Sequence, residues 1–213
     1  MTDHDYGIET RCLHAGQIPD PATGSRATPL YQTASYVFDD TDHAASLFNA
    51  QTFGNVYSRM SNPTTAVFEE RMASLEGGRA ALAVASGMAA QMTALLTLLG
   101  EGDELVSAST LYGGSYSQFD VTFRRMGINT IFVDPDDPAN FRSAITERTK
   151  AVYIETIGNP SNNLIDIEAV ADIAHDAGTE HMWQSVVRTG RAAAARSEIK
   201  DVRVIVCVLK ART

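Results

Sequence analysis

Apolar residues between positions 80 and 177 recur in short blocks that alternate between two spacings. Short runs of consecutive apolar or β-branched residues predict strands at Ala80–Ala85, Glu104–Ser107, Asn129–Val133 and Ala151–Glu155. Apolar residues at helical spacing predict a helix after each strand, at Met88–Leu99, Tyr116–Met126, Ala139–Ile145 and Ile167–Ala177. Strands that alternate with helices need crossover connections, which produce a parallel sheet covered on both faces. The pattern therefore predicts an α/β fold with a doubly wound, mainly parallel sheet.

The chain before residue 80 has a weaker pattern. A polar opening rich in Pro, Gly and Thr leads into an apolar, β-prone segment at Tyr31–Phe38 and a short predicted helix at Thr41–Ala50. We expect this part to form an arm rather than a core. A longer helix is predicted to begin at Pro63, because Asn62 is a typical N-cap and proline suits the first helical position. Gly77 is predicted to end it.

The composition is that of a globular chain, with 44% hydrophobic and 20% charged residues. No run approaches about 18 consecutive apolar residues, and no basic stretch followed by an apolar run opens the chain, so we expect a cytoplasmic protein. Cys12 and Cys207 lie far apart without a Cys/His cluster, which argues against a metal site and a disulfide framework. A net charge of -9 disfavours nucleic acid and anionic membranes as partners. We expect a small-molecule substrate.

Charge is divided unevenly along the chain. Residues 1–178 hold 10 basic and 23 acidic residues, a net charge of -13, whereas residues 179–213 hold 7 basic and 3 acidic residues, a net charge of +4. The last 35 residues also contain the single Trp, no Pro and an Arg/Ala-rich run at Arg188–Arg196. The sequence therefore changes character after Gly178.

Chemistry is expected where strands of such a sheet end, because ligands bind at the carboxyl ends of parallel strands. The turn at Ser86, Gly87 and Met88 leads from a predicted strand into a helix, so backbone N–H groups and a hydroxyl could receive a phosphate. An ordinary tight turn explains the same residues. This turn has neither the G-K-[ST] of a Walker loop nor the G-x-G-x-x-G of a dinucleotide site.

Aromatic and carboxamide side chains follow the next strands. Tyr112 stands before two glycines, where its ring could stack on a flat heterocycle and its phenol could move protons. Asn159 precedes a proline, and its carboxamide could bind a ring hydroxyl or a carboxylate. Upstream, Tyr57 and Arg59 form a possible phosphate clamp. Each feature alone has an ordinary structural explanation, as a cover for the sheet end, a turn or a solvated surface.

Four motifs in order carry a resemblance to a known family. Y-S-R-x-x-N-P-T from Tyr57, S-G-M-A-A from Ser86, L-Y-G-G-S-Y from Leu111 and E-T-x-x-N-P from Glu155 closely resemble the Cys/Met-metabolism family of pyridoxal-phosphate (PLP) enzymes. The resemblance spans residues 10–178 and implies the aspartate-aminotransferase-like fold, PLP fold type I. The opening motifs, among them L-H-A-G-Q at residues 13–17, are most similar to the O-acetylhomoserine sulfhydrylase branch. Cystathionine synthases, cystathionine lyases and methionine γ-lyases share the later motifs and stay open as alternatives.

The resemblance implies roles for the residues named above. Gly87 and Met88 would donate backbone N–H groups to the PLP phosphate, with Ser86 at the same turn. Tyr57 and Arg59 would reach that phosphate from a neighbouring subunit, which implies a homo-oligomer, a dimer or tetramer.

The reacting side of the site is implied in the same way. Tyr112 would stack on the pyridine ring and act as a catalytic residue, and Asn159 would lie near the ring hydroxyl and the substrate. The implied reaction is γ-replacement, in which sulfide takes the place of the acetate of O-acetylhomoserine to give homocysteine, a step in methionine and cysteine metabolism.

Two groups of the family pattern are missing from the chain. The family holds PLP through a lysine and pairs the ring nitrogen with an aspartate, on V-D-N-T-like and S-x-T-K-like motifs beyond the position of Gly178. Residues 179–185 have the sequence T-E-H-M-W-Q-S instead. Lys150 opens a predicted strand at the wrong end of the sheet, and Lys200 and Lys210 do not follow the family pattern. We therefore expect the chain to be inactive by itself.

These observations divide the chain into three parts. We expect an N-terminal arm at residues 1–62 that contributes to a neighbouring subunit's site, an incomplete PLP-binding domain at 63–178, and an anomalous tail at 179–213. Out-of-frame translation of a GC-rich message would explain the tail. A natural divergent ending stays open, because the apolar run Val202–Leu209 would suit a buried strand. A non-catalytic remnant or oligomer-binding protein that docks with intact relatives is the alternative function.

Overall fold

The computed structural model describes residues 6–78, 80–178, 180–185 and 203–206. The chain forms two compact units, one that runs to Ala83 and one that begins at Val84. In the described residues no helix has both the length and the apolar character needed to cross a membrane.

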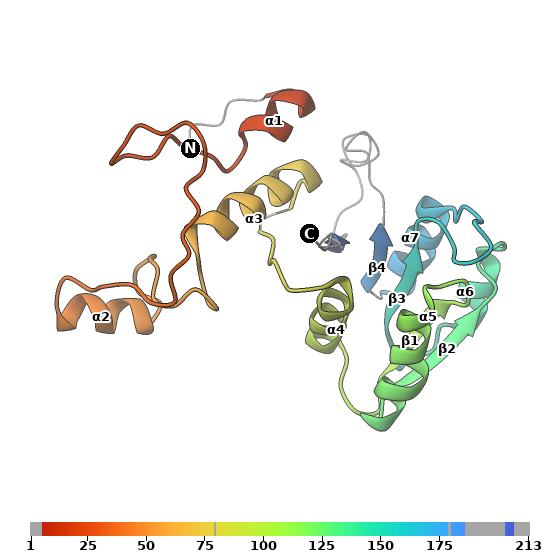
Figure 1. Cartoon of the computed structure of the whole chain (residues 1–213). Coiled ribbons are helices and arrows are strands. Elements are labelled where there is room, and N and C mark those ends of the chain that lie inside the picture. Colours follow the sequence, from red (N-terminus) through yellow and green to blue (C-terminus); the bar gives the residue numbers. More distant parts are fainter. Residues whose placement is uncertain (1–5, 79, 179, 186–202, 207–213) are drawn as a thin grey trace. The chain divides into compact units, whose positions relative to one another are not determined.

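The described residues of the first unit form the helices α1 at Ile8–His14, α2 at Thr41–Phe48 and α3 at Pro63–Glu76 (Figure 1). The helix predicted to begin at Pro63 is confirmed. The side chain of Asn62 accepts the N–H of Thr64 at 2.9 Å, and Gly77 ends the helix in the left-handed conformation with φ of 69°. The predicted helix from Thr41 is also confirmed, although it ends two residues earlier than expected.

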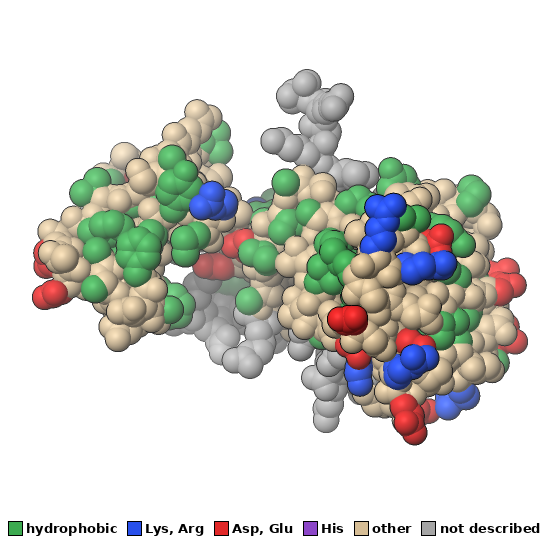
Figure 2. All heavy atoms as spheres, turned by 90° about the horizontal axis from the view of Figure 1, so that it is seen from below, with side chains coloured by type: hydrophobic (Ala, Val, Ile, Leu, Met, Phe, Trp, Pro, Cys, Tyr) green, Lys and Arg blue, Asp and Glu red, His purple; other side chains and the backbone are tan. Residues whose placement is uncertain are grey.

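The first unit buries little apolar surface. Among its described residues Ala73 is the single buried hydrophobic residue. Val37 and Phe53 are 96% and 107% exposed. In the view of Figure 2, apolar side chains cover much of the visible face of this unit. The β-prone segment at Tyr31–Phe38 forms no strand and contributes one isolated antiparallel bridge, from Ser35 to Tyr57.

The second unit is built on a sheet of five strands. They are β1 at Glu104–Ala108, β2 at Asn129–Val133, β3 at Thr149–Glu155, β4 at Glu180–Ser185 and β5 at Arg203–Val206. Their order is β2-β1-β3-β4-β5, and every neighbouring pair is parallel. The predicted parallel sheet is therefore confirmed. From β1 the chain adds β2 on one side and β3 on the other, so the switch point of the topology lies between β1 and β3.

Helices surround this sheet (Figure 1). They are α4 at Gly87–Leu98, α5 at Gly113–Ser117, α6 at Ala139–Ala144 and α7 at Ile167–Asp176. Helix α5 continues directly into a π-helical segment, η1, at Gln118–Phe123. Successive residues of a strand face opposite sides of the sheet, and in β3 both Tyr153 and Ile154 are fully buried. Helices therefore cover both faces of the central strand, as the sequence predicts.

Two sequence predictions for residues 80–126 need correction. The strand predicted at Ala80–Ala85 is wrong, because its described residues are irregular and none of the five strands pairs with them. An apolar run forms a strand only where a neighbouring strand accepts its backbone hydrogen bonds. The helix predicted from Tyr116 begins at Gly113, three residues earlier.

The segment after Gly178 begins with regular structure. Residues 180–185 form β4, which lies parallel to β3 with Glu155 opposite Gln184. Strand β5 falls inside the apolar run Val202–Leu209. Residues 186–202 and 207–213, including Lys200 and Lys210, lie outside the described residues.

Candidate functional site

Two loops meet at the switch point of the sheet, beyond the carboxyl ends of β1 and β3. Tyr112 follows β1 and Asn159 follows β3, so both predicted residues lie at this end. The backbone N–H of Asn159 donates to the carbonyl oxygen of Thr110 at 3.3 Å, which joins the two loops. A crevice at such a switch point is where open α/β sheets bind ligands.

Tyr112 is held by its backbone and leaves its side chain free to meet a ligand. Its N–H donates to both carboxylate oxygens of Glu155, at 3.0 and 3.1 Å, while its side chain is half exposed. The ring lies over Gly114, where an added Cβ would stand 2.5 Å from Tyr112 Cε1. The Gly-Gly turn therefore makes room for the ring as well as starting α5.

The predicted phosphate turn opens α4. Ser86 is the N-cap, with an extended backbone, and its hydroxyl accepts the N–H of Ala89 at 3.2 Å. The next two N–H groups, of Gly87 and Met88, have no acceptor in the part of the chain that the structure describes. The first turn of a helix carries such unpaired donors and a partial positive charge, which together suit an anion.

The Asn159 loop is closely packed. Its Asn159–Pro160 peptide bond is cis. The N–H of Gly158 donates to the carbonyl oxygen of Asn163 at 2.9 Å, and the side chain of Asn163 donates to Asp136 at 2.7 Å. Two buried oxygens, Thr110 Oγ1 and Asn163 Oδ1, have no hydrogen-bond partner among the described residues. The carboxamide of Asn159 itself is exposed at this end of the sheet.

Tyr57 and Arg59 belong to the first unit. The guanidinium of Arg59 lies over the Tyr57 ring, 5.1 Å from its centroid, a cation–π contact. The N–H of Ser58 donates to the carbonyl oxygen of Ala34 at 2.9 Å, and Asn62 donates to the Ser58 hydroxyl at 3.0 Å. The loop that carries the pair is thus fixed to the start of α3.

Sequence reasoning missed two buried polar residues behind the site. Glu155, the last residue of β3, is 1% exposed, and Gln91 in α4 is fully buried. Burial raises the pKa of the Glu155 carboxyl above its ordinary value, and hydrogen bonds from the Tyr112 N–H and the Ser115 hydroxyl partly oppose this rise. The available signal was a carboxylate that ends a buried strand and a carboxamide in an otherwise apolar helix.

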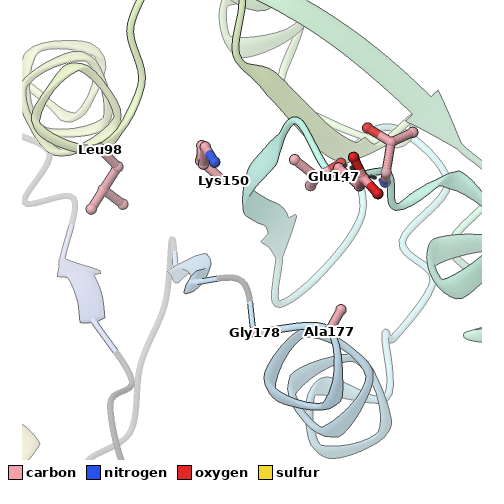
Figure 3. A pocket seen from close by; sticks show the side chains of 7 residues that line it. Leu98, Glu147, Lys150, Ala177 and Gly178 are labelled. Carbon is pink, nitrogen blue, oxygen red and sulfur yellow. Dashed lines mark hydrogen bonds between the residues drawn. The ribbon is translucent and has the colours of Figure 1, made fainter.

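Lys150 lies at the other end of the sheet, as expected from its place at the start of β3. It lines a cavity of about 300 Å³ together with Leu98, Thr146, Glu147, Thr149, Ala177 and Gly178. Figure 3 shows Lys150 and Leu98 beside this cavity, across from Ala177 and Gly178. Among the described residues Lys150 is the single lysine, so none stands at the carboxyl ends of the strands.

The parallel sheet and its helices are those of a fragment of the PLP-dependent type I fold. The chain superposes on an O-acetylhomoserine (thiol)-lyase crystal structure from Campylobacter jejuni, which contains N′-pyridoxyl-lysine-5′-monophosphate. The TM-score is 0.82 at 36% identity, over 88% of this chain and 46% of that chain. Residues 9–195 match the family model of Cys/Met metabolism PLP-dependent enzymes, and the chain belongs to this family.

The chain is also similar in sequence to individual enzymes. The chain is 56% identical to an O-acetyl-L-homoserine sulfhydrylase from Leptospira meyeri over 174 residues, 82% of this chain. It is 55% identical to a homocysteine synthase from Schizosaccharomyces pombe over 175 residues, again 82% of this chain. The chain spans about two fifths of the length of these relatives, 39% and 41%. The family match extends to residue 195, beyond the predicted boundary at 178.

Proposed function

We propose that this chain forms the phosphate-binding and ring-binding side of a PLP site that performs γ-replacement on O-acetylhomoserine with sulfide, giving homocysteine. The observation that carries the proposal is the pair of N–H groups of Gly87 and Met88, which have no acceptor among the described residues and lie in the same unit as Tyr112 and Asn159 at the switch point. The names of the relatives support this choice of substrate over those of the cystathionine and methionine γ-lyase branches.

Each residue has a separate task in this proposal. The N–H groups of Gly87 and Met88 bind the phosphate, with the exposed Ser86 at the same turn. The Tyr112 ring covers one face of the heterocycle, and its phenol holds or moves a proton of the substrate. The Asn159 carboxamide donates to the ring hydroxyl or to the substrate carboxylate. When bound, PLP supplies the electron sink that makes carbon acids of an amino acid reactive.

Tyr57 and Arg59 complete the phosphate site of a neighbouring subunit in a homo-oligomer. Arginine stacked on a ring keeps its donors free for a phosphate, and the loop is already fixed by Ser58 and Asn62. The exposed apolar surface of the first unit, with Val37 and Phe53 as examples, supports burial of this unit against another subunit. The cytoplasmic location and the oligomer size stay predictions.

The described residues fit the phosphate and the ring of PLP but offer no lysine for covalent attachment. We therefore expect the purified chain to bind PLP reversibly and without a covalent link. Titration with PLP should produce an absorbance band that dialysis removes and that borohydride does not fix to the protein. A band that survives dialysis and is fixed by borohydride contradicts the expected reversible binding, because such a band requires a lysine at the site that forms a covalent link with PLP. No binding at all contradicts the proposed site.

A further inference from the structure

We infer that Glu155 and Gln91 are positioning residues, which hold the turn of Tyr112 in place against the first turn of α4. The inference rests on the proposed function and deepens it, because it explains how separate elements present one surface to PLP. Neither side chain faces the expected ligand. Both act on the site through residues that do.

Glu155 fixes the backbone of Tyr112. Its carboxylate is 1% exposed and accepts the Tyr112 N–H with both oxygens, at 3.0 and 3.1 Å. The hydroxyl of Ser115 lies 3.5 Å from the same carboxylate. Burying a carboxylate is unfavourable unless hydrogen bonds compensate. These donors therefore hold the Tyr112 turn at one position beyond the end of β3.

Gln91 fixes the helix on the other side. It lies one turn after Met88 in α4 and is fully buried. Its carbonyl oxygen accepts the hydroxyls of Ser115 at 3.1 Å and Tyr153 at 2.9 Å. Its amide nitrogen donates to Gln118 Oε1 at 2.6 Å and contacts the sulfur of Met88 at 3.5 Å. A buried carboxamide with both ends paired has one stable orientation.

Ser115 joins the two halves of this network. Its hydroxyl lies within hydrogen-bond distance of both acceptors, 3.1 Å from Gln91 Oε1 and 3.5 Å from Glu155 Oε1, and its one proton is shared between them. The π-helical segment η1 begins directly after α5, at Gln118, the residue that pairs with the Gln91 amide. Single π turns inside helices are frequent at functional sites. Elements α4, α5, η1 and β3 thus share one paired network behind the site.

The test compares Glu155→Met with Glu104→Gln as a control. Glu104 is also a buried glutamate, at the amino end of β1, where Arg148 donates to it at 2.5 Å. We measure amide hydrogen exchange of Tyr112 and binding of PLP and of inorganic phosphate to the full chain. E155M should speed Tyr112 exchange and weaken PLP binding about tenfold, because the acceptor of the Tyr112 N–H is lost. E104Q should change neither, although it should lower the stability of the domain.

Two milder variants keep the test decisive. Glu155→Gln retains an oxygen that accepts the Tyr112 N–H, so it should restore most of the exchange protection. Ser115→Ala removes the shared hydroxyl and should weaken PLP binding about 2- to 10-fold, with inorganic phosphate binding unchanged. If E155M does not fold, Ser115→Ala and E155Q still decide the matter.

Several results would overturn the inference. The first is an amide exchange rate of Tyr112 in E155M that lies within twofold of the wild-type rate. The second is an equal loss of PLP binding in E104Q and E155M, because this would show that Glu155 has only a structural role. Unchanged PLP binding in Ser115→Ala would also contradict it. If the wild-type chain binds no PLP, the proposed function fails, but the exchange comparison still tests the positioning of Tyr112.

Discussion

Gly158 lies against the side chain of Asn163 more closely than any other residue type could. Its N–H donates to the Asn163 carbonyl oxygen at 2.9 Å, and a Cβ placed on it would stand 1.9 Å from Asn163 Oδ1 and 2.7 Å from Thr110 Oγ1. The close approach keeps the Asn159 loop folded onto the end of β1. Three glycine substitutions and the pH dependence of stability test the Asn159 loop and the residues around the expected PLP site.

Gly158→Ala should destabilise the second unit by about 1–3 kcal/mol, because the new methyl group overlaps two buried oxygens and the loop must shift. Urea unfolding measures the change. Gly113→Ala is the control, since a Cβ on Gly113 meets no atom within 4 Å. Equal stability of the Gly158→Ala and Gly113→Ala variants would show that the loop accommodates the methyl group without cost.

Gly114→Ala should act on the Tyr112 ring rather than on stability. The added methyl group would stand 2.5 Å from Cε1 of that ring, which must turn away, while alanine favours the helix by about 0.5–1 kcal/mol. We expect weaker PLP binding, measured by absorbance titration, with unchanged or higher resistance to urea. Gly113→Ala again serves as the control, and PLP affinity equal to wild type in Gly114→Ala would mean that the ring position does not matter for binding.

Gly87→Pro tests the phosphate donors. Proline at the first helical position removes the Gly87 N–H without disturbing the helix, and the extended Ser86 is compatible with a following proline. We expect binding of inorganic phosphate and PLP to fall about tenfold, as measured by isothermal titration calorimetry. Thr41→Pro makes the same change at the exposed first position of α2 and should leave binding intact. Undiminished phosphate binding in Gly87→Pro would remove this N–H from the site.

The raised pKa of Glu155 predicts a pH dependence of stability. In the range above the ordinary value of 4.5, the folded chain retains a proton that the unfolded chain has lost. The stabilising contribution of this group is therefore complete below about pH 4.5 and is lost as the pH rises through the folded pKa. Urea unfolding of wild type and Glu155→Gln at several pH values should show wild type losing stability relative to the variant over this window. A difference that does not vary with pH contradicts the prediction.

The local elements could be predicted from sequence where local chemistry decides them. Strand β2 has its predicted bounds, Asn129–Val133, and α3 begins at the predicted Pro63 because its cap is encoded by neighbouring residues. The strand expected at Ala80–Ala85 depends on a distant pairing partner, which no local pattern reveals. An apolar run is thus a necessary but not a sufficient signal.

The same limit applies to the site. Tyr112 and Asn159 were expected at the carboxyl ends of strands, and parallel pairing brings both to one end of the sheet. The sequence marks Gln91 and Glu155 only as a carboxamide in α4 and a carboxylate at the end of β3, because their partners are long-range: Gln91 meets Tyr153, and Glu155 meets Tyr112. The roles of Tyr57 and Arg59 stay predictions, since they belong to the other unit.

The pairing of β1 has a consequence for how the chain folds during synthesis. Glu104 lies opposite Asn129 on one side and Thr149 on the other, so β1 has no neighbour until β2 and then β3 have left the ribosome. Contacts between positions so far apart in sequence form slowly, and an unpaired apolar strand is exposed meanwhile. The apolar residues of nascent β1 therefore lack both of their sheet neighbours until residues 109–155 have been synthesised.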